Sequence, residues 1–129
     1  MNITEVRVRY KETDQMGVVY YSNYLVWFEV ARTDFFREKG FIYNLLEKED
    51  KIYLPVVEAH CRYKAPIKYD DLVTIETTLK EMSGKRLTFE YTVKVKGKIK
   101  TKGYTKHVFV DKSGSPIKIP EKIVKAFQV

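Results

Sequence analysis

The chain has 129 residues, which fits one domain that can bury a sizeable core. With 44% hydrophobic and 32% charged residues, its composition is that of a globular protein and excludes a disordered tail. No run of about 18 apolar residues is present to span a bilayer, and the opening "MNITEVRVRYKETD" lacks the apolar centre of a secretory signal. We therefore expect one cytoplasmic domain over 1–129, without stable membrane insertion.

The formal net charge of +7 favours an anionic partner, which can be nucleic acid, a membrane surface or a phosphorylated small molecule. Lysines are densest in "VKVKGKIKTKGYTKH", where they alternate with apolar residues and threonine. Such alternation is typical of a solvated strand face. The run therefore favours a strand over a nucleic-acid site.

The first predicted element is a strand over 3–12, "ITEVRVRYKE", in which Val6, Val8 and Tyr10 alternate with charged residues. A loop follows, and then a helix from about Ser22 to Lys39. Ser22 or Asn23 can cap the start of this helix, and Gly40 can end it in a left-handed conformation. One face of the helix gathers apolar residues at spacings of three and four, namely Tyr24, Trp27, Phe28, Ala31 and Phe35.

The second half of the chain changes to an apolar period of two. Four strands are predicted within 54–67, 71–82, 85–96 and 97–112, joined by the tight turns "KYDD", "SGK" and "KGK". The segment 41–53 is ambiguous between a short helix and a loop, and 121–129 can form a short helix. The predicted class is α+β, with a twisted antiparallel sheet wrapped around one long helix.

The long helix carries more apolar surface than one face of a small sheet can cover, because Leu25, Val26 and Phe36 add to the apolar stripe. We therefore expect a dimer or a higher oligomer. Glu29 and Arg32 lie three residues apart on this helix, and we expect them to pair with each other or across an interface.

Two interpretations of Asp14 stand side by side. In "ETDQMG" its carboxylate can bond backbone N–H groups of a turn in which Gly17 supplies positive φ. Alternatively, unpaired N–H groups at the start of the helix, around Tyr21 to Asn23, can polarise a substrate carbonyl while the carboxylate stands nearby. Gly17 would let the backbone approach such a ligand closely.

No Ser-His-Asp or Cys-His set is available for acyl transfer. His60 and Cys61 are adjacent in a strand, so they point to opposite faces. Cys61 is the single cysteine, for which we expect structural burial, and neither His60 nor His107 has metal-ligand spacing with another ligand. A carboxylate would therefore have to act as base or nucleophile.

The segment "VRVRYKETDQMGVVYYSNYLVWFEVARTDFF" resembles the N-terminal signature of the hotdog-fold acyl-CoA thioesterases of the 4-hydroxybenzoyl-CoA thioesterase family, and particularly their Tol-Pal-associated group. "VVEAHCRYKAPIKYDD" and "KRLTFEYTV" resemble later strands of the same family. The likeness extends to about Val110. Its matching blocks are Thr13-Asp14, Gly17 to Tyr20, Asn23-Tyr24, Phe28-Glu29 and Ala31-Arg32.

The resemblance implies a hotdog fold, a five-stranded sheet around the helix, in which two sheets join edge to edge as a homodimer and dimers pair into homotetramers. It implies hydrolysis of an acyl-CoA to a carboxylic acid and free coenzyme A, with water as the only cosubstrate and neither cofactor nor metal. Asp14 would be the catalytic nucleophile or general base, and the backbone N–H of Tyr21 would polarise the thioester carbonyl. Many members of the Tol-Pal-associated group carry histidine at the position of Tyr21, so a proton-transfer role of that side chain is absent here.

Substrate contacts are expected from Gly17, Val18 and Tyr24 beside the catalytic residues, although Tyr24 also belongs to the predicted core. Because coenzyme A carries phosphates, cations are expected near the pocket mouth, and the candidates are Arg62, Lys64, Lys68, Lys85 and Arg86. Two alternatives stay open: a hotdog hydratase or dehydratase, which would need a histidine-based pair, and a non-enzymatic module that binds acyl-CoA or nucleic acid.

Overall fold

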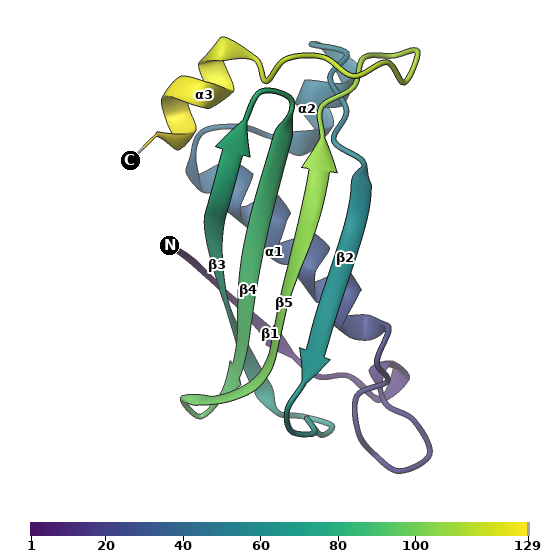
Figure 1. The fold of residues 1–129 in the computed structure, drawn as a ribbon. Helices are drawn as coiled ribbons and strands as arrows, with labels where there is room; N and C mark the ends of the chain where they lie inside the picture. The colour runs from purple at the N-terminus through teal and green to yellow at the C-terminus, as the bar shows by residue number, and fades with distance from the viewer. Residues whose placement is uncertain (129) are drawn as a thin grey trace.

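The computed structural model describes residues 1–128, so that only Val129 of the predicted domain lies outside the described residues. The helices are α1 (Asn23–Glu38), α2 (Tyr43–Lys48) and α3 (Glu121–Phe127), together with a short 3₁₀ turn at Tyr10–Glu12. The strands are β1 (Asn2–Arg7), β2 (Val56–Tyr63), β3 (Leu72–Ser83), β4 (Arg86–Val95) and β5 (Lys98–Val108) (Figure 1).

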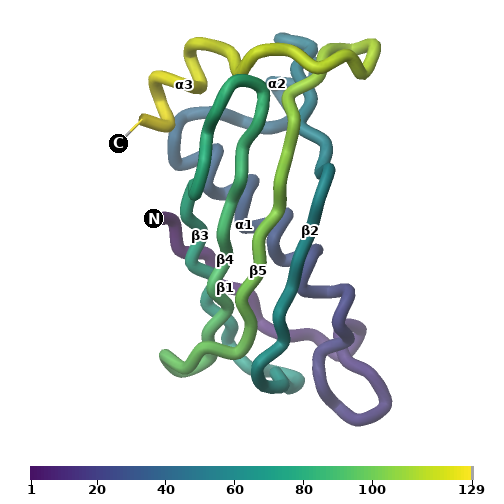
Figure 2. Tube along the Cα trace, in the orientation of Figure 1, coloured from purple at the N-terminus to yellow at the C-terminus, as the bar shows by residue number. Residues whose placement is uncertain are grey.

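The strands form one antiparallel sheet in the order β1-β3-β4-β5-β2. The sheet curves around α1, which lies against its inner face, while α2 and α3 lie beyond one end of the strands (Figures 1 and 2). This architecture confirms the predicted α+β class with its five-stranded antiparallel sheet around one long helix. The period-two pattern was informative because β3, β4 and β5 each bury one face.

The predicted apolar stripe of α1 is buried against the sheet, with Trp27 and Phe28 at most 1% exposed. The Phe28 ring stacks on Tyr91 of β4 with 4.1 Å between ring centroids. Helix and sheet approach closely here because β5 contributes Gly103. A Cβ atom at that position would lie 2.5 Å from the carbonyl oxygen of His60 and 2.7 Å from the Phe28 ring. Gly40 ends α1 with φ of +93°, as predicted.

Three predicted strands are shorter by at least four residues in the structure, and the one predicted within 97–112 covers only Lys98–Val108. The strand predicted over 3–12 ends at Arg7, because the Glu12 carboxylate accepts a hydrogen bond from the Arg9 backbone N–H and draws the chain into the 3₁₀ turn. The strand predicted within 54–67 covers only Val56–Tyr63. The alternating pattern did not reveal these ends, and for the first strand the reason is the local hydrogen bond of Glu12.

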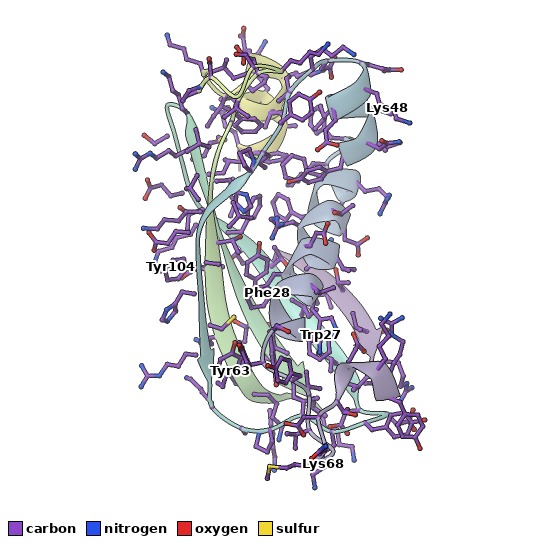
Figure 3. The ribbon with its side chains drawn as sticks, turned by 90° about the vertical axis from the view of Figure 1, so that its right-hand side faces the viewer. Trp27, Phe28, Lys48, Tyr63, Lys68 and Tyr104 are labelled. Atoms are coloured by element: carbon purple, nitrogen blue, oxygen red, sulfur yellow. The ribbon has the colours of Figure 1, made fainter. Side chains whose placement is uncertain are left out.

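Among the described residues, strand β2 pairs only with β5, so it forms an open edge of the sheet. Both of its faces are largely exposed, including Val57 at 60% and Tyr63 at 47%. Figure 3 looks onto this edge, with α1 on one side of the sheet and Tyr104 on the other. Helix α1 also exposes apolar side chains, namely Leu25, Val26 and Val30. Within residues 1–128, no helix is both long enough and apolar enough to cross a membrane.

Candidate active site

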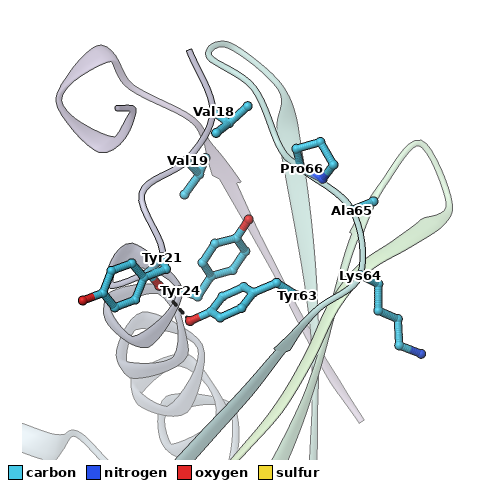
Figure 4. Close-up of a pocket in the computed structure, with 8 residues that line it drawn as sticks. All are labelled: Val18, Val19, Tyr21, Tyr24, Tyr63, Lys64, Ala65 and Pro66. Atoms are coloured by element: carbon cyan, nitrogen blue, oxygen red, sulfur yellow. Dashed lines mark hydrogen bonds between the residues drawn. The ribbon is translucent and has the colours of Figure 1, made fainter. Parts of the chain in front are cut away.

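A pocket of about 320 Å³ opens at the N-terminal end of α1. We call it the tyrosine pocket, because Tyr21 from the loop, Tyr24 from α1 and Tyr63 from β2 form much of its wall (Figure 4). The Tyr24 and Tyr63 rings meet edge to face at 5.0 Å, and the Tyr63 hydroxyl donates to the Tyr21 carbonyl at 3.1 Å. The remaining lining residues are Val18, Val19, Lys64, Ala65 and Pro66.

Asp14 lies in the tight loop that leads to this pocket. Its Oδ1 accepts the backbone N–H of Met16 at 2.8 Å and that of Val18 at 3.4 Å, and Gly17 adopts φ of +81°. The turn interpretation of Asp14 is therefore confirmed. Its other carboxylate oxygen, Oδ2, accepts no hydrogen bond from the residues that the structure describes, so one oxygen orders the loop while the second has no partner among them.

The start of α1 leaves two backbone donors without acceptors. Asn23, Tyr24 and Leu25 donate to the carbonyls of residues 20, 21 and 22, respectively. Across residues 1–128, no acceptor is found for the N–H groups of Tyr21 and Ser22. Such groups at a helix start carry partial positive charge, and Tyr21 belongs to the wall of the pocket.

Glu12 anchors the loop to the helix, and the sequence patterns did not single it out. It is 3% exposed, and its Oε1 and Oε2 accept the Arg9 backbone N–H and the Trp27 indole N–H, each at 2.9 Å. Its carbonyl oxygen accepts Tyr20 N–H and the Asn23 side chain. Burial would raise the pKa of Glu12, but the hydrogen bonds from Arg9 and Trp27 outweigh it and lower that pKa. The one sequence signal for this role was the carboxylate of Glu12 itself, in "YKETD" at the end of the predicted strand.

The thioesterase-like superfamily matches residues 8–127. The chain belongs to this superfamily. It is 39% identical to the putative acyl-CoA thioesterase YneP of Bacillus subtilis over 84% of this chain and 78% of that protein. The DHNA-CoA thioesterase of Staphylococcus aureus is 35% identical, with a TM-score of 0.92 over 97% of this chain and 87% of that one.

The 4-hydroxybenzoyl CoA thioesterase of Pseudomonas sp. strain CBS-3 is 23% identical, and its TM-score of 0.90, over 97% of both chains, shows a shared fold. The predicted hotdog fold is thereby confirmed. Membership of the family, together with the named homologues, also identifies the chain as an enzyme with thioesterase activity.

Two tyrosines of the pocket, Tyr24 and Tyr63, have a raised pKa. Burial raises the pKa of Tyr63 to about 12, with the neighbouring Cys61 thiol adding to the effect, and burial also raises the pKa of Tyr24. Cys61 is half-buried on the inner face, whereas His60 stacks on Tyr104 at the outer face. The two neighbours thus point to opposite sides, as predicted, and neither histidine lines the tyrosine pocket.

The structure brings only some of the predicted substrate contacts to the pocket. Val18, Tyr24 and Lys64 line it, although the Lys64 side chain points away from the tyrosines in Figure 4. Gly17 adjoins Val18 in the loop. Lys68 pairs with Val18 through an isolated backbone bridge and lines a separate groove with Lys96, Lys98 and Lys100.

Arg62, Lys85 and Arg86 do not reach the tyrosine pocket of their own chain. Arg62 alternates with Cys61 along β2 and therefore faces outward. Arg86 pairs with Val108 and Tyr63 with Thr101, and these two positions of β5 lie roughly 23 Å apart at about 3.3 Å per residue. Lys85 and Arg86 thus lie at the opposite end of the sheet. The sequence placed both residues at a turn, but it did not show whether that turn lies at the same end of the sheet as the pocket.

A second cavity, of about 370 Å³, lies between α1 and α2. We call it the Arg32 cavity; its lining residues are Glu29, Arg32, Thr33, Tyr43, Asn44, Glu47 and Leu54. The predicted pairing of Glu29 with Arg32 inside one chain is wrong. Arg32 is 8% exposed and its Nη1 donates to the Tyr91 hydroxyl at 3.3 Å, while no ion pair of Arg32 is formed within residues 1–128.

Proposed function

We propose that the chain hydrolyses an acyl-CoA thioester to a carboxylic acid and free coenzyme A, with Asp14 as the catalytic carboxylate. The observation that carries this proposal is that Asp14 uses only Oδ1 within residues 1–128, in a loop that leads directly into a helix start with two unpaired N–H groups. The names of YneP and of the Staphylococcus aureus thioesterase support coenzyme A as the thiol part of the substrate.

In the proposed reaction, the thioester carbonyl oxygen accepts the Tyr21 backbone N–H, which stabilises the negative charge of the tetrahedral intermediate. Asp14 then acts in one of two ways. As a nucleophile, Oδ2 bonds to the carbonyl carbon and expels the thiolate, and water hydrolyses the resulting mixed anhydride. As a general base, Oδ2 takes a proton from the water that attacks the same carbon. Both routes use water as the only cosubstrate, without a cofactor or metal.

We further propose a cytoplasmic homodimer of single-domain subunits, residues 1–129, joined through β2, with dimers pairing into tetramers. The open edge and the exposed valines of β2 support this pairing. A two-fold axis perpendicular to the sheet makes the two β2 strands antiparallel. It brings the partner's Lys85 and Arg86 to the end of the sheet where Asp14 lies, so these cations can bind the coenzyme A phosphates with Lys64. Arg62 would contribute from the outer face, and Gly17, Val18 and Tyr24 would contact the acyl end.

The alternatives have less support. A hydratase or dehydratase needs an acid-base histidine, and among the described residues neither His60 nor His107 lines the tyrosine pocket. A nucleic-acid module would use the lysines of β5, which alternate along a strand as solvated side chains do. We therefore propose no nucleic-acid partner.

Release of free thiol from several acyl-CoAs, measured for the parent chain and for Asp14→Asn, tests the proposal. Asparagine keeps an oxygen for the loop hydrogen bonds but cannot act as base or nucleophile, so we expect kcat to fall at least about a hundredfold. Asp70→Asn, in the turn before β3, is the matched control and should retain the parent rate. Full hydrolysis by Asp14→Asn would disprove the role of Asp14, and a parent that releases no thiol would favour a binding module.

A further inference from the structure

The Arg32 cavity contains a buried cation that forms no ion pair within residues 1–128, although two glutamates also line the cavity. The Arg32 side chain is 8% exposed, its Nε has no hydrogen-bond partner among the described residues, and its one hydrogen bond is the 3.3 Å contact with the Tyr91 hydroxyl. An unpaired buried charge is unfavourable by several kcal/mol in general, so proteins rarely retain one that nothing binds. The cavity beside it, about 370 Å³, is large enough to admit part of a ligand.

The groups behind Arg32 are neutral. The Tyr91 hydroxyl forms a hydrogen bond with the Thr105 hydroxyl, with 2.6 Å between the oxygens. The Thr105 hydroxyl in turn forms a hydrogen bond with His107 Nε2 at 2.8 Å. Burial, with the Arg32 charge adding to it, lowers the pKa of His107 to about 4, so His107 is uncharged at neutral pH. The network therefore orients the guanidinium without balancing its charge, and the balancing oxygen has to come from the cavity side.

The register of β2 indicates what meets this cavity. Directly opposed residues of an antiparallel pair point to the same face of the sheet, so a two-fold axis at this edge must set one central residue of β2, either Ala59 or His60, opposite its own copy. Followed along the strand, the first register sets Lys64 opposite the partner's Leu54, and the second sets Pro66 there. Lys64 and Pro66 line the tyrosine pocket, and Leu54 lines the Arg32 cavity. In such a dimer the tyrosine pocket of one subunit adjoins the Arg32 cavity of the other.

We propose that Arg32 of one subunit determines the acyl specificity of its partner's active site, favouring acyl groups whose far end carries a hydrogen-bond-accepting oxygen. The inference rests on the proposed thioesterase function and on the β2-paired dimer. The thioester lies at Asp14 and Tyr21 of one subunit, and the far end of the acyl group enters the cavity of the other. There the oxygen accepts a charge-assisted hydrogen bond from the Arg32 guanidinium.

Two glutamates also face the cavity and refine the preference. Glu29 comes from α1 and Glu47 from α2, and both are more exposed than Arg32, so water screens them more strongly. Thr33, Tyr43 and Asn44 add neutral polar groups. A hydroxyl can accept from Arg32 and donate to a glutamate, whereas a carboxylate gains more from Arg32 and is repelled by the glutamates. Both end groups share the accepting oxygen, and a direct comparison of the two shows which effect is larger.

The first experiment compares kcat/KM for benzoyl-CoA, 4-hydroxybenzoyl-CoA and 4-carboxybenzoyl-CoA, which differ only at the far end. For the parent we expect at least one oxygen-bearing substrate to exceed benzoyl-CoA by about ten- to a hundredfold, the range of one hydrogen bond to a charged group. Arg32→Met should bring that ratio close to one. Arg37→Met, exposed on the same helix, is the matched control and should keep the parent ratio.

The ratio of kcat/KM between the oxygen-bearing substrate and benzoyl-CoA also distinguishes a failure of this inference from a failure of the proposed function. If the parent hydrolyses none of these thioesters, or if Asp14→Asn hydrolyses them fully, the proposed function itself fails. If the parent and Asp14→Asn behave as expected but Arg32→Met keeps the parent ratio, only the role of Arg32 is overturned. Should Arg32→Met not fold, Arg32→Lys is the second variant: it keeps the charge and loses the planar fork, and we expect an intermediate ratio. An unchanged ratio in a folded Arg32→Lys would contradict the proposal.

The second experiment tests whether Arg32 acts across the interface. Subunits carrying Asp14→Asn and Arg32→Met, each with a different affinity tag, are co-expressed and the mixed dimer is purified through both tags. If Arg32 serves the partner's site, one of the two sites in this dimer contains both Asp14 and Arg32. It should then show the parent substrate ratio at about half the parent rate. A mixed dimer with the ratio of Arg32→Met would place Arg32 in its own subunit's site and overturn the proposal.

Discussion

The two ends of α1 are built in different ways. At the N-terminal end, which we call the pocket end, Tyr24 lines the tyrosine pocket and contacts Trp27, and hydrogen bonds to the buried Glu12 hold the loop in place. At the C-terminal end, which we call the aromatic end, Phe36 packs against Phe89 and Phe127, and α3 covers the core.

This difference indicates how one helix serves both stability and chemistry. Aromatic packing fills space, so the aromatic end contributes burial of apolar surface. The hydrogen bonds of Glu12 fix the loop with a few directed contacts and leave a cavity beside it. Substitutions at the aromatic end should therefore reduce mainly stability, and those at the pocket end should also reduce activity.

The largest expected loss of stability is for Phe36→Ala at the aromatic end. Phe36 is fully buried, and its ring centroid lies 5.0 Å from that of Phe127 and 4.8 Å from that of Tyr43. Removing a buried phenyl ring leaves a cavity and should lower the free energy of unfolding by about 3–5 kcal/mol, measured by urea denaturation. Leu45→Ala, at a 40% exposed site on α2, should lower it by less than about 1 kcal/mol. Equal losses in the two variants would contradict the comparison.

An intermediate effect is expected from pH, through His107. Burial and the Arg32 charge lower the pKa of His107 from 6.5 to about 4 in the folded state. Between these pH values the unfolded chain binds the proton more readily, so the free energy of unfolding should fall as pH drops from about 6.5 to about 4, by roughly 3 kcal/mol at most.

Thermal unfolding of the parent and of His107→Gln across this range measures the contribution. His107→Gln should lose most of the pH dependence, whereas His60→Gln, on the outer face, should retain it. A His107→Gln variant whose melting temperature varies with pH as steeply as that of the parent would show that other groups cause the effect.

A smaller loss of stability, joined by a loss of activity, is expected for Glu12→Gln at the pocket end. Both carboxylate oxygens accept N–H donors, so an amide NH₂ group must face one of these donors. The free energy of unfolding should fall by about 1–3 kcal/mol, and kcat for acyl-CoA hydrolysis should fall as the loop that carries Asp14 loses its anchor. Glu5→Gln, exposed on β1, is the control and should change neither quantity. A Glu12→Gln enzyme with the parent kcat would mean that the loop is positioned without this carboxylate.

Much of the fold followed from patterns that are local in sequence. Spacings of three and four placed α1 within one residue of its observed ends, and the period-two runs located β3, β4 and β5. Periodicity sufficed because each of these elements buries one face. The end of β1 was wrong because the Glu12 carboxylate, and not the apolar pattern, decides where that strand stops.

The candidate site was accessible only in part. Four residues of the candidate site lie within eleven positions of the sequence, namely Asp14, Val18, Tyr21 and Tyr24. A short sequence signature therefore contains all four of them. Tyr63 completes the pocket from 42 residues away through its hydrogen bond to Tyr21, a contact that no local pattern contains. For Lys85 and Arg86 the sequence showed the positive charge, which made them candidates for phosphate binding. It did not show that they lie far from the pocket of their own chain.

The sequence by itself determined the class of the fold, the path of α1 and the position of Asp14 in a tight turn, since these depend on residue spacing and on the backbone preference of Gly17. Among residues 1–128, the tertiary structure decided which carboxylate oxygen of Asp14 is free, which N–H groups at the helix start are unpaired, and that Arg32 is buried without an ion pair. These properties depend on hydrogen-bond partners and burial supplied by distant segments, and only the packing of α1 against the curved sheet brings those segments together.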